Sequence, residues 1–347
     1  MQLRWTEVRV DLVHAFTIAH GTSDHRVNIA IQLEHEGKVG LGLAAPNPRY
    51  GETPASTVAA LAKMACLLPE SPWLFQDGMQ DIDAIPGAYA AKAALEMAML
   101  DWVGKVANCP LYRLFGIDPG KMPPTSMTIG IDTLERVKEK VRQVPQFEVL
   151  KVKLDGKNDR TLISAIREVT TQTLRVDANE GWKDPEQAAR EIDWLAGQGV
   201  ELVEQPMPAE QTEAMAWLKP RSALPLIADE SFHGHASAEA LRDGFHGINI
   251  KLMKCGGLLQ ARRWITLARY FDLKIMLGCM VASCVSIAAA AQIAPEVDLV
   301  DLDGHLLIAN DPFEGLGLHQ GRLVPGVQPG LGVAIKKETH LSFRQNI

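Results

Sequence analysis

One pattern recurs through the middle of this chain: a short β-rich run, a polar residue at its end, and then a helical stretch. The runs are Ser126 to Ile129, Val149 to Leu154, Leu174 to Asp177, Leu202 to Glu204, Leu226 to Asp229, Ile248 to Lys251, Lys274 to Gly278 and Val297 to Asp301. From Lys153 to Lys251, the polar ends follow one another after 24, 27, 25 and 22 residues. Eight strands at about one βα unit apart predict a (β/α) barrel. An open doubly wound sheet would ordinarily carry a phosphate-binding glycine loop after an early strand, and none occurs.

The length of 347 residues predicts more than one domain, because single cores stop growing at roughly 250 to 300 residues. Before the barrel lies an α+β region, with β-rich runs at Arg4 to Val13, Val27 to Glu34 and Lys38 to Ala45 and helices at Ala55 to Leu68 and Ala88 to Val106. Pro119 to Pro124 reads as a linker. We therefore expect a capping domain over residues 1–120 and a catalytic barrel over residues 121–320.

The composition argues for a small-molecule substrate in a reducing compartment. A net charge of -7, with no basic run, argues against a nucleic-acid partner or an anionic membrane surface. Ile275 to Pro295 contains no charge, but its glycine, serines and alanines indicate a strand, a turn and a packed helix rather than a membrane span. The N-terminus lacks the apolar stretch of a signal peptide, and the five cysteines have no CxxC spacing. These features predict reduced thiols and a cytoplasmic location.

Three consecutive runs end in carboxylates: Asp177, Glu204 and Asp229. In a barrel of this kind the carboxyl ends of the strands form the active site, so these side chains are predicted to converge. A single one would more often be a surface or helix-capping residue. Three like charges brought together need a cation, and an all-oxygen ligand set favours Mg²⁺, with Mn²⁺ as the alternative.

Lysines occur where apolar side chains would be expected. Lys151 and Lys153 lie within the apolar run Val149 to Leu154, and Lys251 closes Ile248 to Lys251. Each alone could extend its charge to solvent at a barrel rim. The second and sixth strands, however, lie across a barrel from each other, so Lys153 and Lys251 would face a substrate from opposite sides. Burial and nearby charge could lower the pKa of such a lysine toward the range that suits a general base.

Five motifs in this order resemble the signatures of the enolase superfamily, in the subgroup that includes muconate cycloisomerases and dipeptide epimerases. The motifs are Lys151-Val-Lys153, Val176-Asp-Ala-Asn179, Val203-Glu-Gln-Pro206, Ala228-Asp-Glu-Ser231 and Asn249-Ile-Lys-Leu252. The resemblance covers nearly the whole chain. It implies a modified TIM barrel, (β/α)7β, with an N-terminal α+β capping domain, and a C-terminal segment, residues 321–347, that packs back on the capping domain.

The resemblance also implies roles for individual residues. Asp177, Glu204 and Asp229 would be the metal ligands. Lys153 and Lys251 would be the acid and base residues. Lys151 would be a cation near the carboxylate of the substrate. Asn179 and Glu230 would support these groups, Glu230 by pairing with a lysine. Proton transfer between the two lysines, through an enediolate stabilised by Mg²⁺, would invert one α-carbon; a lysine base with Mg²⁺ is an established pattern of this superfamily. A homo-oligomer is expected.

The reaction is narrowed by Asp301-Leu-Asp303-Gly, which resembles the Asp-x-Asp that receives the substrate ammonium group in dipeptide epimerases. Two carboxylates on one strand face suit an ammonium group. We therefore expect a dipeptide epimerase. The alternative is an o-succinylbenzoate synthase or a muconate cycloisomerase-type lyase of the same subgroup, and neither of those reactions needs an ammonium partner.

The sequence leaves open which side chains the dipeptide carries. Family members that act on Ala-Glu tend to carry an arginine in an early loop, and this chain has His20 or Gly21 near that place. Arg26 or Arg49 could replace that arginine and bind an acidic substrate side chain. Asp24 could instead favour a substrate with a cationic side chain, and a neutral pocket would favour an apolar side chain. His20 and Asp24 are thus candidate substrate-binding residues. Relatives also usually have an acidic residue where this chain has Ala282, so the role of that loop stays open.

Overall fold

The structure is a computed structural model that describes residues 1–18, 21–234 and 236–345. Its largest element is a parallel sheet of eight strands: β4 (Ser126–Ile129), β5 (Val149–Lys153), β6 (Thr173–Asp177), β7 (Val200–Glu204), β8 (Leu226–Ala228), β9 (Gly247–Lys251), β10 (Lys274–Gly278) and β11 (Leu299–Asp301). The strands neighbour one another in chain order, and a parallel bridge between Thr125 and Val300 joins the first edge to the last. Each predicted run matches one strand to within two residues, so the barrel is confirmed.

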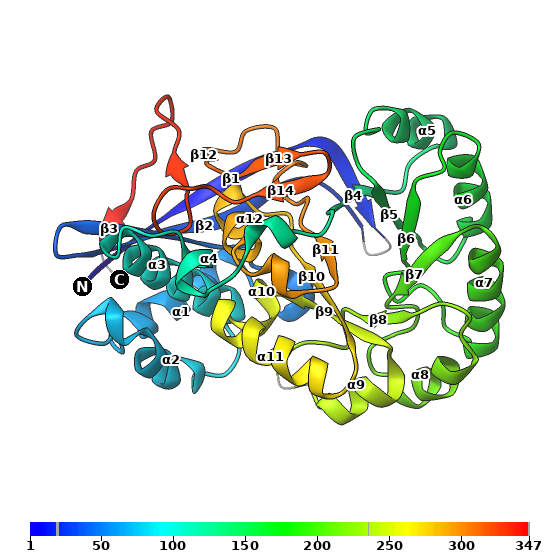
Figure 1. Ribbon diagram of the computed structural model, residues 1–347, viewed down its shortest axis with the longest axis horizontal. Coiled ribbons are helices and arrows are strands. Elements are labelled where there is room, and N and C mark those ends of the chain that lie inside the picture. Colours follow the sequence, from blue (N-terminus) through cyan, green and yellow to red (C-terminus); the bar gives the residue numbers. More distant parts are fainter. Residues whose placement is uncertain (19–20, 235, 346–347) are drawn as a thin grey trace.

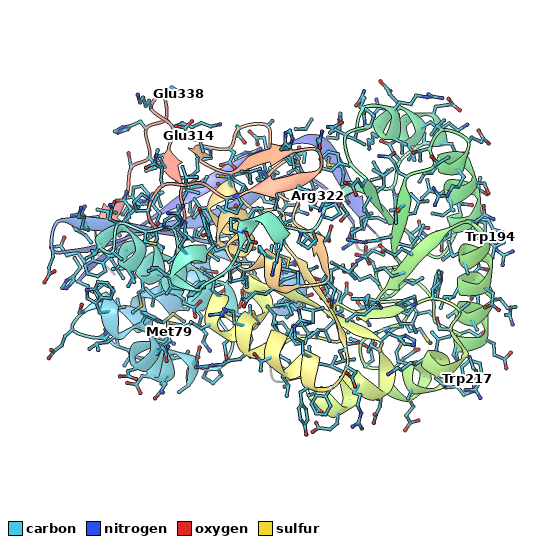
Figure 2. The ribbon with its side chains drawn as sticks, in the orientation of Figure 1. Met79, Trp194, Trp217, Glu314, Arg322 and Glu338 are labelled. Carbon is cyan, nitrogen blue, oxygen red and sulfur yellow. The ribbon has the colours of Figure 1, made fainter. Side chains whose placement is uncertain are left out.

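Helices occupy each of the seven connections between these strands, as (β/α)7β predicts: α5 (Leu134–Arg142), α6 (Asp159–Arg167), α7 (Pro185–Gly197), α8 (Thr212–Leu218), α9 (Ala238–Gly244), α10 (Leu252–Cys255) with α11 (Leu258–Tyr270), and α12 (Cys284–Ala291). In α7 the Asp184 side chain accepts hydrogen bonds from the first-turn amides of Glu186 and Gln187. The labelled Trp194 and Trp217 in Figure 2 mark α7 and α8 in this outer layer of helices.

The capping domain is built on an antiparallel sheet of β1 (Gln2–Ile18), β2 (Gly21–His35) and β3 (Lys38–Ala44). Helices α1 (Pro54–Ala65), α2 (Phe75–Asp83), α3 (Tyr89–Val106) and α4 (Leu111–Leu114) complete it. The central helix α3 lies directly on β3, and a Cβ atom added at Gly40 or Gly42 would come within 2.0 Å of a carbonyl oxygen of α3. Glycine is required there because the two backbones approach so closely.

Helix α2 was not predicted. Its segment contains Gly78 and three aspartates, which weaken a helical pattern. It forms because Met79 and Ile82 are buried against the rest of the domain and because Gly78 packs on Pro69 at a distance that no Cβ would allow. The two helices that the sequence did predict are present as α1 and α3, and Thr53 and Ser56 form the capping box of α1.

The β1–β2 hairpin reaches from the capping domain across to the barrel (Figure 1). It is longer than the predicted runs, and its register shifts between Asp11 and Phe16. Between these two paired residues β1 has four residues, whereas β2 has one, Asp24. Beside this irregularity, the Val13 amide donates to the Leu307 carbonyl of the barrel at 3.0 Å. The hairpin is thereby fixed to the segment that follows β11.

The remaining elements are short. Past β11 the chain forms β12 (Phe313–Glu314) with β15 (Ala334–Ile335), β13 (Gly317–His319) with β14 (Arg322–Val324), and β16 (Arg344–Gln345), which pairs with β1. The 3₁₀ turns are η1 (Pro48–Tyr50), η2 (Pro72–Leu74), η3 (Pro119–Lys121), η4 (Lys219–Arg221) and η5 (Ala294–Glu296). All five cysteines are free thiols. Among the described residues, no helix is both long and apolar enough to cross a bilayer.

Candidate active site

Three carboxylates meet at the carboxyl ends of consecutive strands. Asp177 ends β6, Glu204 ends β7, and Asp229 follows β8 directly. One oxygen of each lies within 4.8 Å of the others, and all three residues are at most 2% exposed. Burial, together with the charge of Asp177, raises the pKa of Glu204 to about 7. Three buried carboxylates so close together could hold a divalent cation with a preference for oxygen.

Further oxygen atoms at this cluster fit a cation site. Asn179 Oδ1 and Glu230 Oε2 are buried, and neither has a hydrogen-bond partner among the described residues. The Asn179 amide donates to Asp177 Oδ1 at 3.0 Å, which fixes that carboxylate from behind. Unsatisfied buried oxygens are costly, so their concentration beside three carboxylates is consistent with a ligand that they help to hold.

Lys153 and Lys251 lie on opposite sides of this cluster. Lys153 Nζ is 2.5 Å from Asp177 Oδ2, and Lys251 Nζ is 2.7 Å from Asp229 Oδ2. Their strands, β5 and β9, are four positions apart in either direction around the eight-stranded barrel, which is the largest separation possible. The pKa of Lys251 is raised, not lowered as expected from the sequence: burial would lower it, but the charges of Asp229 and Glu204 outweigh burial.

Lys151 projects to the same side of β5 as Lys153 and lies at the centre of the charged groups. Its Nζ is 2.7 Å from both Glu204 Oε2 and Asp301 Oδ2 and 3.2 Å from Asp177 Oδ2. Burial opposes its charge, but the surrounding carboxylates, first Asp301, hold its pKa well above the ordinary value. Lys151 is therefore a fixed positive charge at the floor of the site.

Asp301 and Asp303 both reach the site but differ in what they bind. Asp301 ends β11 and accepts hydrogen bonds from Lys151 and, at 2.6 Å, from Ser126 Oγ. Burial alone would raise its pKa, yet Lys151 lowers it to about 2. Asp303 Oδ2 accepts from the Thr128 amide at 2.6 Å, while burial and the charge of Asp301 raise its pKa to about 6. Of the pair, only Asp303 lacks a cationic partner within the described residues.

One predicted contact is wrong. Glu230 was expected to pair with a lysine, but its Oε1 accepts a 3.4 Å hydrogen bond from Asn179 Nδ2, and it makes no ion pair within the described part of the chain. The nearby lysines, Lys251 and Lys254, both bind Asp229 instead. Their two positive charges hold the pKa of Asp229 well below its ordinary range in spite of burial, whereas burial raises the pKa of Glu230 to about 8.

Two residues of the site were missed from the sequence. Lys254 is fully buried, and its Nζ is 2.5 Å from Asp229 Oδ1 and 2.6 Å from the Asp229 carbonyl. Asn249 Nδ2 donates to Glu204 Oε1 at 2.9 Å. Both could have been found: Lys254 is another lysine in an apolar segment, and Asn249 lies two residues before Lys251 and so on the same strand face.

The cluster opens into a cavity of about 650 Å³ between the barrel and the capping domain. The capping domain contributes residues of β2 and of the turn η1. Two contacts join the domains at its edge. Arg49 binds Glu180 through two nitrogens, with Nη2 2.8 Å from both carboxylate oxygens, and the Tyr50 ring stacks on His233 with 4.4 Å between centroids.

The expected specificity residues lie in different places. His20 lies outside the described residues. The Asp24 side chain is 80% exposed and binds His25 Nδ1 at 2.7 Å, whereas its neighbours Ser23 and Arg26 line the cavity. The structure therefore does not bring Asp24 to the site. Ala282 is fully buried, and it is Met280 and Val281 of the same loop that line the cavity.

Comparison with known proteins agrees with this architecture. Residues 1–116 match the mandelate racemase/muconate lactonizing enzyme N-terminal domain, and residues 132–339 match the enolase C-terminal domain-like family. The chain is 40% identical over 335 residues to the L-Ala-D/L-Glu epimerase of Bacteroides thetaiotaomicron, covering 96% of this chain and 88% of the relative.

Two solved structures are also similar. A dipeptide epimerase from Cytophaga hutchinsonii, complexed with Mg and the dipeptide D-Ala-L-Val, superposes with a TM-score of 0.93 at 26% identity, covering 99% of this chain and 98% of that one. A dipeptide epimerase from Methylococcus capsulatus, complexed with Mg and L-Arg-D-Lys, gives a TM-score of 0.88 at 33% identity, covering 96% and 99%. The two domain matches and these full-length similarities establish that the chain belongs to the mandelate racemase/muconate lactonizing enzyme family of the enolase superfamily.

Proposed function

We propose that this protein epimerises dipeptides with Lys153 and Lys251 as two bases, one of which removes the α-proton while the other supplies a proton to the opposite face. The observation that carries the proposal is the placement of two buried lysine side chains on opposite sides of one carboxylate cluster. Inversion of a carbon requires a proton to leave one face and another to arrive at the opposite face. Two proton carriers that face each other across a cavity meet that requirement.

The charged groups suggest how a dipeptide would lie. Its carboxylate would point to the barrel floor, toward Lys151 and the cluster of Asp177, Glu204 and Asp229. Its ammonium group would lie against Asp303, which forms no ion pair with a lysine among the described residues. Asp301 would act indirectly, since it already holds Lys151. This orientation sets the α-carbon of the second residue between the two lysines.

The three carboxylates would hold Mg²⁺ or Mn²⁺, with Asn179 and Glu230 supporting the site. A bound divalent cation would stabilise the negative charge that develops on the substrate carboxylate as the α-proton leaves. The two lysines would carry out the proton transfer. One lysine, in its neutral form, accepts the α-proton, and the other, as an ammonium group, donates a proton to the opposite face. For the other epimer the two lysines exchange roles.

The relatives support this reaction class but differ in substrate. The Bacteroides relative is named for Ala-Glu dipeptides, the Cytophaga structure holds D-Ala-L-Val, and the Methylococcus structure holds L-Arg-D-Lys. Acidic, apolar and cationic second residues are all represented. Mg accompanies the dipeptide in both of those structures.

The test is deuterium exchange in D₂O with Mg²⁺ and a set of L-Ala-L-Xaa dipeptides. Epimerisation predicts a mass gain of one unit, located at the α-carbon of the second residue, together with the appearance of the L,D epimer. Exchange with no dipeptide would refute the proposal. Formation of o-succinylbenzoate or lactonisation of muconate, assayed in parallel, would instead support the lyase alternative.

A further inference from the structure

In each of the three clustered carboxylates the two oxygens have different partners. One oxygen contacts a lysine that lines the cavity: Lys153 with Asp177 Oδ2, Lys151 with Glu204 Oε2, and Lys251 with Asp229 Oδ2. The other oxygen accepts a hydrogen bond from a different donor: the Asn179 amide with Asp177 Oδ1 at 3.0 Å, Asn249 Nδ2 with Glu204 Oε1 at 2.9 Å, and Lys254 Nζ with Asp229 Oδ1 at 2.5 Å. The same division on three successive strands means that one oxygen of every carboxylate is engaged by the protein.

Lys254 binds Asp229 in two ways. Its Nζ donates to the side chain and also to the Asp229 carbonyl at 2.6 Å, so it fixes the side chain relative to the main chain. Lys254 is fully buried, its ammonium group lies 5.4 Å from the centre of the Phe232 ring, and it does not line the cavity. It therefore cannot touch a substrate, and it acts on the site through Asp229.

Asn249 stands in the same relation to Glu204. It is fully buried on β9 and does not line the cavity. Its side chain is closely confined, because a Cβ atom added at Gly278 of the next strand would lie 2.4 Å from Asn249 Oδ1. Glu204 sets the orientation of the amide, since the reverse orientation would bring two oxygens together. Asn249 thus acts on the site through Glu204.

We propose that Lys254 and Asn249 are positioning residues that restrict Asp229 and Glu204 to one ligand oxygen each, and that they thereby make the cation site selective for Mg²⁺ or Mn²⁺ against Ca²⁺. This inference rests on the metal site of the proposed function. Ca²⁺ takes roughly six to eight oxygen ligands and often uses both oxygens of a carboxylate, whereas the smaller Mg²⁺ needs about six and usually keeps several water molecules. Carboxylates that each have one oxygen engaged suit the smaller ion.

A purely electrostatic role of Lys254 predicts a different result. The positive charge beside Asp229 weakens the binding of every divalent cation, and it does so about equally for ions of the same charge. A positioning role changes the ratio of two affinities instead, because Ca²⁺ gains most from a second carboxylate oxygen. Asn249 separates the two roles, since its removal frees Glu204 Oε1 without a change in charge.

The test is titration calorimetry of the full-length, chelator-treated protein with Mg²⁺, Mn²⁺ and Ca²⁺. We expect the wild type to bind Mg²⁺ at least about 10-fold more tightly than Ca²⁺. In Lys254→Met and in Asn249→Ala this ratio should fall by about 10-fold, because Asp229 or Glu204 can then offer both oxygens. Lys92→Met is the matched control: Lys92 is a buried lysine of α3 that donates to the carbonyls of Asp83 and Ile85, and its loss should leave the ratio unchanged.

The outcomes separate this inference from the proposed function. A ratio that falls in both variants supports the inference even if no dipeptide is epimerised, in which case the proposed reaction fails alone. A variant that changes both affinities by the same factor would overturn the role of its residue and leave epimerisation intact. Wild-type protein that binds Ca²⁺ as tightly as Mg²⁺ would overturn the selectivity, and binding of no divalent cation would overturn the metal site with it. If the Tm shows that Lys254→Met does not fold, Asn249→Ala decides.

Discussion

The barrel and the capping domain contribute to one cavity in different ways. The barrel contributes charged groups that are almost fully buried and contact one another, such as Lys151, which lies within 3.2 Å of three carboxylates. The capping domain contributes Arg26 and Arg49, which are more exposed and lie outside that cluster. Burial and close charges raise the pKa of Glu204 and of Lys251 in the barrel, and the proposed proton transfer lies among these groups. The capping residues Arg26 and Arg49 are candidates for contacts with the rest of the substrate.

The largest effect should come from the barrel lysines. Lys153→Ala or Lys251→Ala should lower kcat for epimerisation by at least about 10³-fold, because one of the two proton carriers is lost. The measurement is epimer formation followed by chiral chromatography. Lys157→Ala is the control, since Lys157 lies exposed in the loop after β5. Near-normal epimerisation in either lysine variant would contradict the assignment of proton transfer to the barrel.

Metal removal should have the next largest effect. Chelation should lower epimerisation by about 10²-fold or more, and added Mg²⁺ or Mn²⁺ should restore it, because three carboxylates of the barrel would hold the ion. In Glu204→Gln, titration calorimetry should show weaker Mg²⁺ binding. Full activity in protein shown by elemental analysis to be free of divalent metal would refute a metal-dependent reaction.

The stability of the protein should depend on pH through Glu96, which lies at the contact between the capping domain and the barrel. This residue of α3 accepts a hydrogen bond from the Leu259 amide of α11 at 3.0 Å, and burial raises its pKa to about 8. The pKa of Glu96 is near 4.5 in the unfolded chain and about 8 in the folded protein. Between these two pH values the unfolded chain loses the Glu96 proton, whereas the folded protein keeps it. Stability is therefore lost as pH rises through this window.

Glu96→Gln should remove this loss. Compared with the wild type, the variant should gain about 3 kcal/mol in the free energy of unfolding between pH 5 and pH 8, measured by urea denaturation. Glu70→Gln, which changes an exposed glutamate of the same domain, should show no such gain. Parallel pH profiles for wild type and Glu96→Gln would show that Glu96 ionises normally in the folded protein.

The smallest effect is expected at the rim. Arg49→Ala breaks the two-nitrogen contact with Glu180, and it should raise KM by about 10-fold with little change in kcat, because the capping domain would close less firmly over the substrate. Steady-state kinetics with the best dipeptide would measure both constants. A fall in kcat as large as that of the lysine variants would remove the distinction between barrel chemistry and capping-domain recognition.

Much of the barrel could be predicted from the sequence. Its strands are short apolar runs with a polar end, and the regular spacing of those ends identified Asp177, Glu204 and Asp229 before any geometry was available. Helix α2 could not be predicted, because its segment is weakly helical and is stabilised by packing of Met79 and Ile82. Lys254 was missed, although it follows the same pattern of a lysine among apolar residues as Lys251.

Which side chains of the β1–β2 hairpin point toward the cavity could not be predicted from the sequence. Alternation along a strand assigns faces only if the register is known, and the irregularity between Asp11 and Phe16 changes which residues of the two strands oppose each other. The sequence led to Asp24 as a candidate substrate-binding residue, with Arg26 named only as a possible replacement for an arginine of the relatives. The structure places Arg26 in it and Asp24 at the surface.

The sequence by itself determined the order and chemistry of the strand ends, because local alternation and spacing follow from backbone geometry alone. Tertiary structure decided which charges meet. Asp301 binds Lys151, and Asp303 has no cationic partner among the described residues. Asp229 binds both Lys251 and Lys254, and Glu230 contacts Asn179 instead. The physical reason is that hydrogen-bonded ion pairs form only between side chains that come within a few ångströms of each other. Barrel closure brings together residues more than a hundred positions apart, and only their final distances select the pairs.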